Sequence, residues 1–486
     1  MTTHAHCSAT QQLVTLLGRP ISQQDRQRAR WHLLDWYACA RHGARDVQGV
    51  RWGRAFAQQA ESYTPTGADA LESFCILPEL VHPDFALRYN AAVGNIGEMD
   101  DVHRQSVLHP GPIVVPVALA TSLVRDRQLK RADGSASGDS AGEGLRTIGA
   151  ATNYVTVNHL LDAIIRGYET TIRVGEALGL AHYRYYHSTA TAGVFGSASA
   201  AASVLGLDDL QWTWALGNAG SVAGGLWQLR NETVNTKQWH NAHAAATGQQ
   251  AALLAASGVT GPLEILEGPQ GLLAVTAEGG HVEAVTAGEA DPWKLHDCSF
   301  KPWPACRHAH PVIDAALGLR EQLQGRDIAR VQIDTYTDAV TFCDRPLPEN
   351  VGDARFSLQY TAAVALLHGA PTLADFEDDA WSRKPFADLM KRVEVVSDGT
   401  FTDAYPDHFG ARVTVWLADP RALPLVAEVR DTLGDPSRPL ERAAHLAKLQ
   451  MLLEMTDTDV TERWANSLLG LDGEAPARSL MTALQT

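Results

Sequence analysis

The chain has 486 residues, of which 45% are hydrophobic and 20% charged, and its formal net charge is −16. A chain of this length can bury a large core, and its acidic balance argues against nucleic acid and anionic membranes as partners, because both require clustered Lys and Arg. The six cysteines lie far apart without a C-x-x-C pair, which argues against a zinc ribbon, an iron–sulfur cluster and a disulfide framework. With no signal-peptide pattern and no apolar run of about 18 residues, we expect a soluble, cytoplasmic protein.

From about residue 10 to about residue 290, apolar residues recur three and four positions apart and glycines stand at the segment ends. This pattern predicts helices, most clearly over residues 25–43 and 157–179. Two further segments, around residues 189–205 and 242–256, are rich in Ala and Gly, and such small side chains let helix backbones approach closely. We therefore expect a compact helical domain over residues 1–293.

After about residue 293 the pattern changes. Residues 330–336, 393–396 and 411–417 alternate with period two, and helical patterns over 311–323 and 358–367 lie around the first of these strands. A smaller α+β domain is predicted over residues 294–438. The last stretch, 439–486, is helical again and would return to the first domain, which makes that domain discontinuous. Residues 131–147, rich in Gly, Ser and charge, are predicted to form a mobile surface loop.

Three carboxylates and two histidines stand close together in residues 98–109, just ahead of an apolar run. Pro110 and Pro112 follow at positions typical of a helix start, where proline loses no hydrogen bond. His109 would then lie at a helix N-terminus, whose free N–H groups favour an anionic ligand such as a carboxylate. An acidic loop that caps a buried helix is the alternative interpretation, because structural ion pairs also gather acids and bases. The side chains concerned are those of Glu98, Asp100, Asp101, His103 and His109.

Four further segments place polar groups among apolar helices. His187 stands at the start of the first small-residue helix, a second N-terminus suited to an anion. Lys237 precedes the Ala-rich helix, and its ammonium group suits a carboxylate. The third segment holds Cys306 and His310, and the fourth holds Tyr360. For each histidine alone a structural role is the alternative; histidine pairs also serve as metal ligands, but no regular Cys/His spacing supports a metal here, and none is predicted.

Together these segments resemble the MmgE/PrpD family over nearly the whole chain. The resemblance rests on Asp100-Asp101 before His109-Pro-Gly, on Gly167-Tyr-Glu with Arg173, on His187-Ser-Thr-Ala-Thr-Ala-Gly193, on Gly206-Leu-Asp, on Lys237 with His240, on Lys301-Pro-Trp-Pro-Ala-Cys306 with His310, and on Phe356-Ser-Leu-Gln-Tyr360. It implies a mainly α protein that has a large all-helical domain with an inserted smaller α+β lid domain. It also implies a homodimer with its active site in the cleft between the domains.

The resemblance further implies chemistry on a small anionic carboxylate without a metal or organic cofactor. His187 becomes the leading acid/base candidate and His109 its partner. The aspartates are expected to orient His103 or His109 rather than to bind an acidic substrate, since like charges repel, and Tyr360 would donate a hydrogen bond from the lid. The predicted catalytic residues are His187, His109, Asp100, Asp101 and Tyr360. The predicted substrate-binding residues are Lys237, Glu98, His103, Cys306 and His310.

One stretch departs from the family pattern: some members have Asp-Phe-Asp-Asp-Thr where this chain has Glu98-Met-Asp-Asp-Val102. The first acid is longer by a methylene, and the hydroxyl is replaced by an apolar side chain. Val102 cannot donate a hydrogen bond to a substrate carboxylate, so we expect the specificity to differ from that of such members.

The function predicted from the sequence is that of a cofactor-independent lyase acting on a small di- or tricarboxylic acid by proton abstraction next to a carboxylate. Dehydration is placed first, epimerisation or racemisation of a dicarboxylic amino-acid derivative second, and decarboxylation third. Two alternatives of other kinds stay open. One is a non-catalytic carboxylate-binding protein, and the other is a metalloenzyme.

Overall fold

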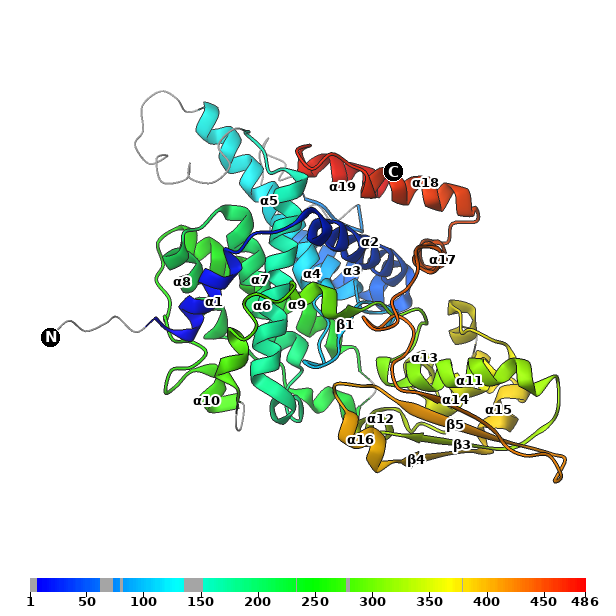
Figure 1. The fold of residues 1–486 in the computed structure, drawn as a ribbon. Helices are drawn as coiled ribbons and strands as arrows, with labels where there is room; N and C mark the ends of the chain where they lie inside the picture. The colour runs from blue at the N-terminus through cyan, green and yellow to red at the C-terminus, as the bar shows by residue number, and fades with distance from the viewer. Residues whose placement is uncertain are drawn as a thin grey trace.

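The computed structural model describes residues 7–61, 73–78, 82–134, 152–232, 234–276, 280–377 and 379–486. These residues are mostly helical and carry two small sheets, which confirms the predicted mainly α fold class. The chain forms a helical unit, made by α1 to α10 and α17 to α19, and an α+β unit, made by α11 to α16 and β3 to β6 (Figure 1). No helix in the described part of the chain has the length and apolar character needed to cross a membrane.

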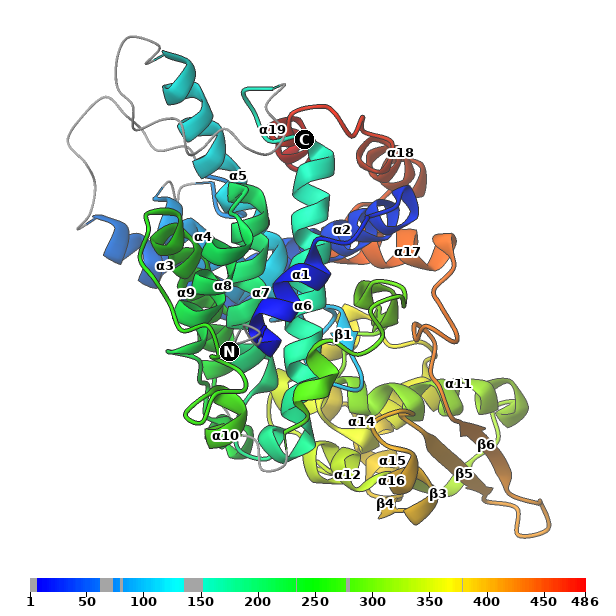
Figure 2. The same ribbon diagram turned by 60° about the vertical axis from the view of Figure 1, so that its left-hand side comes forward.

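The helical unit draws its helices from both ends of the chain. Its first helices are α1 (Ala9–Leu17), α2 (Gln23–Arg45), α3 (Val47–Glu61), α4 (Pro83–Val93) and α5 (Gly111–Gly134). They are followed by α6 (Val157–Tyr183), α7 (Ser188–Leu205), α8 (Asp209–Gly220), α9 (Thr236–Ala256) and α10 (Leu272–Thr276). The C-terminal helices are α17 (Arg442–Leu453), α18 (Thr458–Leu469) and α19 (Ala477–Gln485), which lie beside α2 and α5 (Figures 1 and 2).

Helix α7 lies at the centre of the helical unit, and every one of its residues is buried. Its small side chains allow close packing against α6 and α9. A Cβ added to Gly196 would lie 1.7 Å from Oγ1 of Thr171 on α6, and one added to Gly248 on α9 would lie 2.4 Å from Cβ of Ser197. The Ala/Gly-rich composition of this segment is thus explained by helix–helix distance.

The α+β unit contains helices α11 (His310–Leu323), α12 (Thr337–Cys343), α13 (Val351–Arg355), α14 (Leu358–Leu367), α15 (Lys384–Met390) and α16 (Gly399–Ala404). Its strands are β3 (Ile328–Thr335), β4 (Val393–Ser397), β5 (Ala411–Leu417) and β6 (Leu425–Val429), in the order β4-β3-β5-β6 (Figure 2). Strands β3 and β4 are parallel and the other pairs antiparallel. Three of these strands were predicted from their alternating residues, and β6 was not.

Each unit has its own hydrophobic core. Leu295 and Cys298 still belong to the first core, whereas Trp303 belongs to the second. After the sheet, Leu446 is again part of the first core. Of the predicted surface loop, residues 131–134 are the end of α5, which corrects that prediction, and the remainder of 131–147 lies outside the described residues.

A two-residue antiparallel pairing joins the two segments that enter the site. Strand β1 (Val102–His103) pairs with β2 (Cys298–Ser299), so Val102 lies opposite Ser299 and His103 opposite Cys298. This pairing brings the acidic segment beside the start of the α+β unit.

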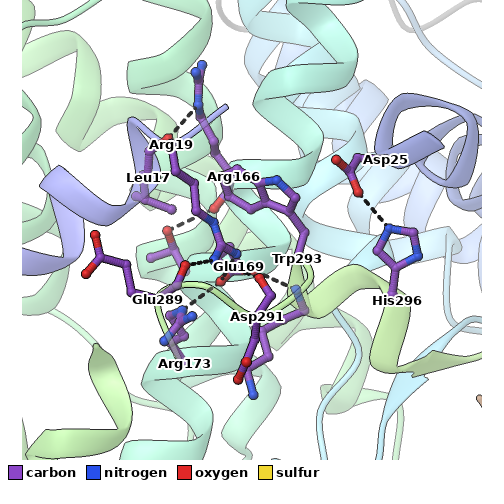
Figure 3. Close-up of polar contacts among 12 residues, drawn as sticks. Leu17, Arg19, Asp25, Arg166, Glu169, Arg173, Glu289, Asp291, Trp293 and His296 are labelled. Carbon is purple, nitrogen blue, oxygen red and sulfur yellow. Dashed lines mark hydrogen bonds and ion pairs between the residues drawn. The ribbon is translucent and has the colours of Figure 1, made fainter. Parts of the chain in front are cut away.

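The loop before β2 is fixed on α6 by a buried carboxylate (Figure 3). Oε1 of Glu169 accepts hydrogen bonds from Arg19 and from Arg173, both at 2.7 Å, and Oε2 accepts one from the backbone N–H of Lys294 at 2.7 Å. Arg19 also stacks over Trp293 at 4.0 Å. The Glu169 and Arg173 motif is therefore structural: it places the chain that leads into β2.

Candidate active site

A cavity of about 200 Å³ lies between the helical and α+β units. It is smaller than the roughly 300–1,000 Å³ of sites for drug-sized ligands, so a small metabolite suits it. The helical unit and its loops contribute carboxylate, imidazole and ammonium groups, and the α+β unit contributes thiol, guanidinium and aromatic groups. The lining includes Glu98, Val102, His109, His187, Trp227 and Lys237 on the side of the helical unit, and Cys306, Arg307, His308 and Phe342 on the side of the α+β unit.

His109 is oriented from behind by Asp100. Nδ1 of His109 lies 2.9 Å from Oδ2 of Asp100 and 3.0 Å from the backbone oxygen of Asp101, which leaves Nε2 for the cavity. Burial opposes ionisation of Asp100, but the positive charges of His109 and Lys301 outweigh it and hold the pKa of Asp100 below its usual range. An ionised carboxylate thus fixes the ring, as in the acid/base pairs of many hydrolytic enzymes.

The Asp101 carboxylate has another role. It accepts hydrogen bonds from Nδ1 of His32 and the hydroxyl of Tyr168, both at 2.6 Å, and from the N–H of Gly111 at 3.1 Å. Its side chain therefore supports the start of α5. Of the two aspartates expected to orient a histidine, Asp100 does so through its carboxylate, and Asp101 contacts His109 through its carbonyl alone.

Glu98 is held between two lysines. Its Oε1 lies 2.5 Å from Nζ of Lys237, and Nζ of Lys301 lies 3.4 Å from its Oε2 and donates to its backbone oxygen at 3.1 Å. Burial alone would raise the pKa of Glu98, but the two lysines lower it overall. Lys301 is fully buried and also lies 3.6 Å from Oδ1 of Asp100. The site wall is thus an alternating row of anions and cations.

His187 precedes the first turn of α7 and stacks on Trp227, with ring centroids 4.4 Å apart and planes 6° apart. Its Nδ1 lies 3.2 Å from Nδ1 of His240 on α9. Burial, followed by the neighbouring His240 and Lys237, lowers the pKa of His187 well below its ordinary value. The ring is therefore neutral at pH 7 and can accept a proton.

The α+β unit closes the cavity with Cys306, Arg307 and His308. His308 lies between the rings of Phe342 and Phe409, at centroid distances of 5.1 and 5.5 Å, and its Nδ1 lies 2.7 Å from the hydroxyl of Tyr336. Burial, then the nearby Arg307 and Lys301, lower the pKa of His308 to about 3. This wall is therefore largely apolar and uncharged around the ring.

Five predicted site residues lie outside the cavity lining: Asp100 and Asp101, which contact His109 from behind, and His103, His310 and Tyr360. Nδ1 of His103 lies 2.7 Å from Oγ of Ser106, and Nε2 of His310 lies 3.1 Å from the carbonyl oxygen of Ala305. The hydroxyl of Tyr360 donates to the carbonyl of Asp375 inside the second core. The prediction that Tyr360 donates a hydrogen bond into the cleft is corrected, because that hydrogen is already used.

Several residues at or beside the cavity were not predicted from the sequence, among them Arg307, His308, Phe342, Lys301, His240 and Trp227. Lys301 begins the motif Lys301-Pro-Trp-Pro-Ala-Cys306, but nothing in that motif indicated that the lysine ammonium group reaches Glu98. His240 follows Lys237 by three positions, one helical turn, and this spacing could have signalled it. Trp227 lies in a short 3₁₀ helix without a local pattern. Among the described residues, no group of three or more His, Cys, Asp or Glu side chains is arranged to hold a metal ion.

Comparison with known families gives two matches along the chain. The MmgE/PrpD N-terminal domain matches residues 14–284, and the MmgE/PrpD C-terminal domain matches residues 303–468. Residues 285–302 separate the two matches, and the second begins at Trp303, where the second hydrophobic core also begins.

Curated relatives are similar at moderate identity. A cis-aconitate decarboxylase of Aspergillus terreus is 26% identical over 474 residues, which cover 92% of this chain and 89% of that protein. A cis-aconitate decarboxylase of Mus musculus is 32% identical over 43% of this chain and 44% of its own length. A 2-methylcitrate dehydratase of Salmonella typhimurium is 30% identical over 30% of this chain and 37% of its own length. The last two alignments therefore span less than half of the relatives.

Proposed function

The chain belongs to the MmgE/PrpD family, and on that premise we propose that it is a cofactor-independent lyase of a small di- or tricarboxylic acid. The observation that carries the proposal is the pairing of two imidazoles at one cavity. His187 is neutral and faces the cavity, and His109 is backed by the ionised Asp100. One can accept a proton while the other donates one.

The first step breaks a C–H bond next to a substrate carboxylate. Its proton passes to Nε2 of His187, and the electron pair delocalises into the carboxylate, which then carries two negative charges. Cations held in a water-poor cavity stabilise such an intermediate. Lys237, with Lys301 behind it, is the cation placed for this.

In the second step the C–O bond to a neighbouring hydroxyl breaks. His109 gives a proton to the departing hydroxide, so water leaves and a carbon–carbon double bond remains. Asp100 stabilises the positive charge that His109 carries before this transfer. Dehydration uses both imidazoles, which is why we place it first.

Decarboxylation is the second candidate function. Two observations favour it: the full-length Aspergillus relative is named for it, and Val102, Trp227 and Phe342 give the cavity an apolar wall beside which a carboxylate loses CO₂ readily. One proton donor then suffices, because the carbanion left by CO₂ takes a single proton. Epimerisation remains a further option, in which the proton returns to the opposite face.

The proposal is tested by incubating the purified protein with cis-aconitate, 2-methylcitrate and a panel of other di- and tricarboxylic acids, and following products by proton NMR. Loss of water supports the first candidate, and release of CO₂ supports the second. Binding without conversion of any acid contradicts the proposed lyase and favours a carboxylate-binding protein. Light scattering on the same sample tests the homodimer that the family resemblance implies.

A further inference from the structure

A second hollow lies beside His240 and adjoins the cavity, with which it shares Leu229, Glu232 and Val234. It has a volume of about 510 Å³ and is lined by residues 222–226, 228 and 229 and by the first turns of α9, including His240 and His243. His240 is partly exposed there, and His243 is exposed. The pair of rings formed by His187 and His240 therefore stands between the cavity, which His187 lines, and the hollow, which His240 lines.

The two rings are held in place for a hydrogen bond. Their Nδ1 atoms lie 3.2 Å apart, and the ring planes are inclined by 34°. Trp227 fixes one ring by stacking, and the backbone N–H of His187 donates to the carbonyl of Gly225 at 2.8 Å. Since two N–H groups cannot face one another at this distance, one Nδ1 donates and the other accepts.

The other imidazole of the cavity has no such outlet. Nδ1 of His109 faces Asp100 and the carbonyl of Asp101. Asp100 is itself enclosed, since it accepts a hydrogen bond from Asn95 at 2.7 Å and faces Lys301. A proton that passed from His109 to Asp100 would enter the protein interior. A proton that passed from His187 to His240 would reach the second hollow.

We propose that His240 is a proton-relay residue, which carries protons between the cavity-facing His187 and the second hollow. It acts through His187 and does not touch the substrate. This inference rests on the proposed function, because it takes His187 to be the group that exchanges protons with substrate carbon.

The relay moves one proton from substrate carbon to solvent. Nε2 of His187 receives a proton from substrate carbon, and the ring becomes an imidazolium. Its Nδ1 proton passes to the lone pair on Nδ1 of His240, which restores a neutral His187. His240, now an imidazolium, releases its Nε2 proton to water in the hollow. The same steps run in reverse bring one proton inward, as protonation of a carbanion left by CO₂ requires.

The test compares His240→Asn with His243→Asn. An asparagine amide can still pair with Nδ1 of His187 but cannot pass a proton through, whereas His243 lies one turn later on the same helix and bonds to Thr247 rather than to His187. The probes are cis-aconitate and 2-methylcitrate in deuterium oxide, and the readout is deuterium incorporation at carbon.

We expect His240→Asn to slow incorporation about tenfold or more with an unchanged KM, and millimolar imidazole to restore it, because a small base can enter the hollow. His243→Asn should exchange at the wild-type rate. Wild-type exchange in His240→Asn, or a loss that imidazole does not restore, overturns the relay.

A second readout separates the relay from the proposed function. If the wild-type protein acts on neither acid, the proposed function fails, and ¹⁵N NMR of the histidine rings decides the relay. The Nδ1 resonance of His187 should then shift in His240→Asn and stay unchanged in His243→Asn. An unchanged resonance in His240→Asn shows that the two rings share no proton and overturns the inference.

Discussion

Nζ of Lys237 lies 2.5 Å from Oε1 of Glu98, so the lysine expected to bind a substrate carboxylate already has an anionic partner. Glu98 itself has a backbone φ of 53°, a left-handed conformation that non-glycine residues seldom adopt. Its side chain is one methylene longer than that of an aspartate. A substrate carboxylate must therefore share or displace this pair, which makes Glu98 a determinant of affinity.

Glu98→Gln should lower the KM for a tricarboxylate by about tenfold, which corresponds to about 1.4 kcal/mol of binding. The change keeps the shape of the side chain but removes the charge that competes for Lys237. Lys237→Met is the matched variant and should raise the KM. Steady-state kinetics with the acid identified from the panel measure both, and a higher KM in Glu98→Gln would show that its charge assists binding.

Tyr360→Phe should leave turnover unchanged and lower the free energy of unfolding by about 1 kcal/mol, because it removes one hydrogen bond to a backbone carbonyl in the second core. Tyr168→Phe is the matched change. It removes a bond to the charged Asp101, and we expect a loss of about 1.5–3 kcal/mol. Urea unfolding and an activity assay measure the two variants. If Tyr360→Phe lost turnover while its stability stayed unchanged, the structural role of Tyr360 would be contradicted and a role of its hydroxyl in the cavity would be supported.

Sequence patterns predicted several of the long helices, such as those over residues 25–43 and 157–179, and three strands, because burial imposes a period on the apolar residues. They could not predict side-chain direction. His103, His310 and Tyr360 stand in the same motifs as true cavity residues, but local turns and the second core point them elsewhere. The ion pairs of Lys301 and the His187–His240 contact arise from segments far apart in the chain, so they appear only once the helices are packed.

Gly196→Ala should destabilise the helical unit by about 1–3 kcal/mol, because the new Cβ would overlap Oγ1 of Thr171 and force α6 and α7 apart. Gly318→Ala on α11 is the control. A Cβ there meets nothing within 4 Å, and alanine favours a helix, so stability should rise by about 0.5–1 kcal/mol. Thermal and urea unfolding measure both changes. Equal effects of the two substitutions would contradict the close helix packing.

The protein should lose stability as the pH falls from about 6.5 to about 4. Three buried histidines have lowered pKa values, and burial is the largest cause for each. The pKa of His42 is about 4, and the pKa values of His103 and His308 are about 3. Between these values and 6.5 the unfolded chain binds more protons than the folded one, so stability rises with pH. Buried Asp35 and Glu176, whose pKa values are raised, oppose the trend.

Each shift of one pKa unit corresponds to about 1.4 kcal/mol. The three histidines, with the larger combined shift, therefore change the free energy of unfolding more than Asp35 and Glu176 do. Urea unfolding at pH 7 and pH 5 measures the loss, and His42→Asn should reduce it. Equal or greater stability at pH 5 would contradict burial of these histidines in their neutral form.

The central claim is that His187 exchanges a proton with substrate carbon in the cavity, while His109 protonates the departing hydroxide. The most direct measurement is deuterium incorporation next to a carboxylate, followed by proton NMR with cis-aconitate and 2-methylcitrate in deuterium oxide. We predict incorporation by the wild-type protein, a rate at least about a hundredfold lower in His187→Gln, and loss of net dehydration in His109→Gln. Incorporation at the wild-type rate in His187→Gln would contradict the account.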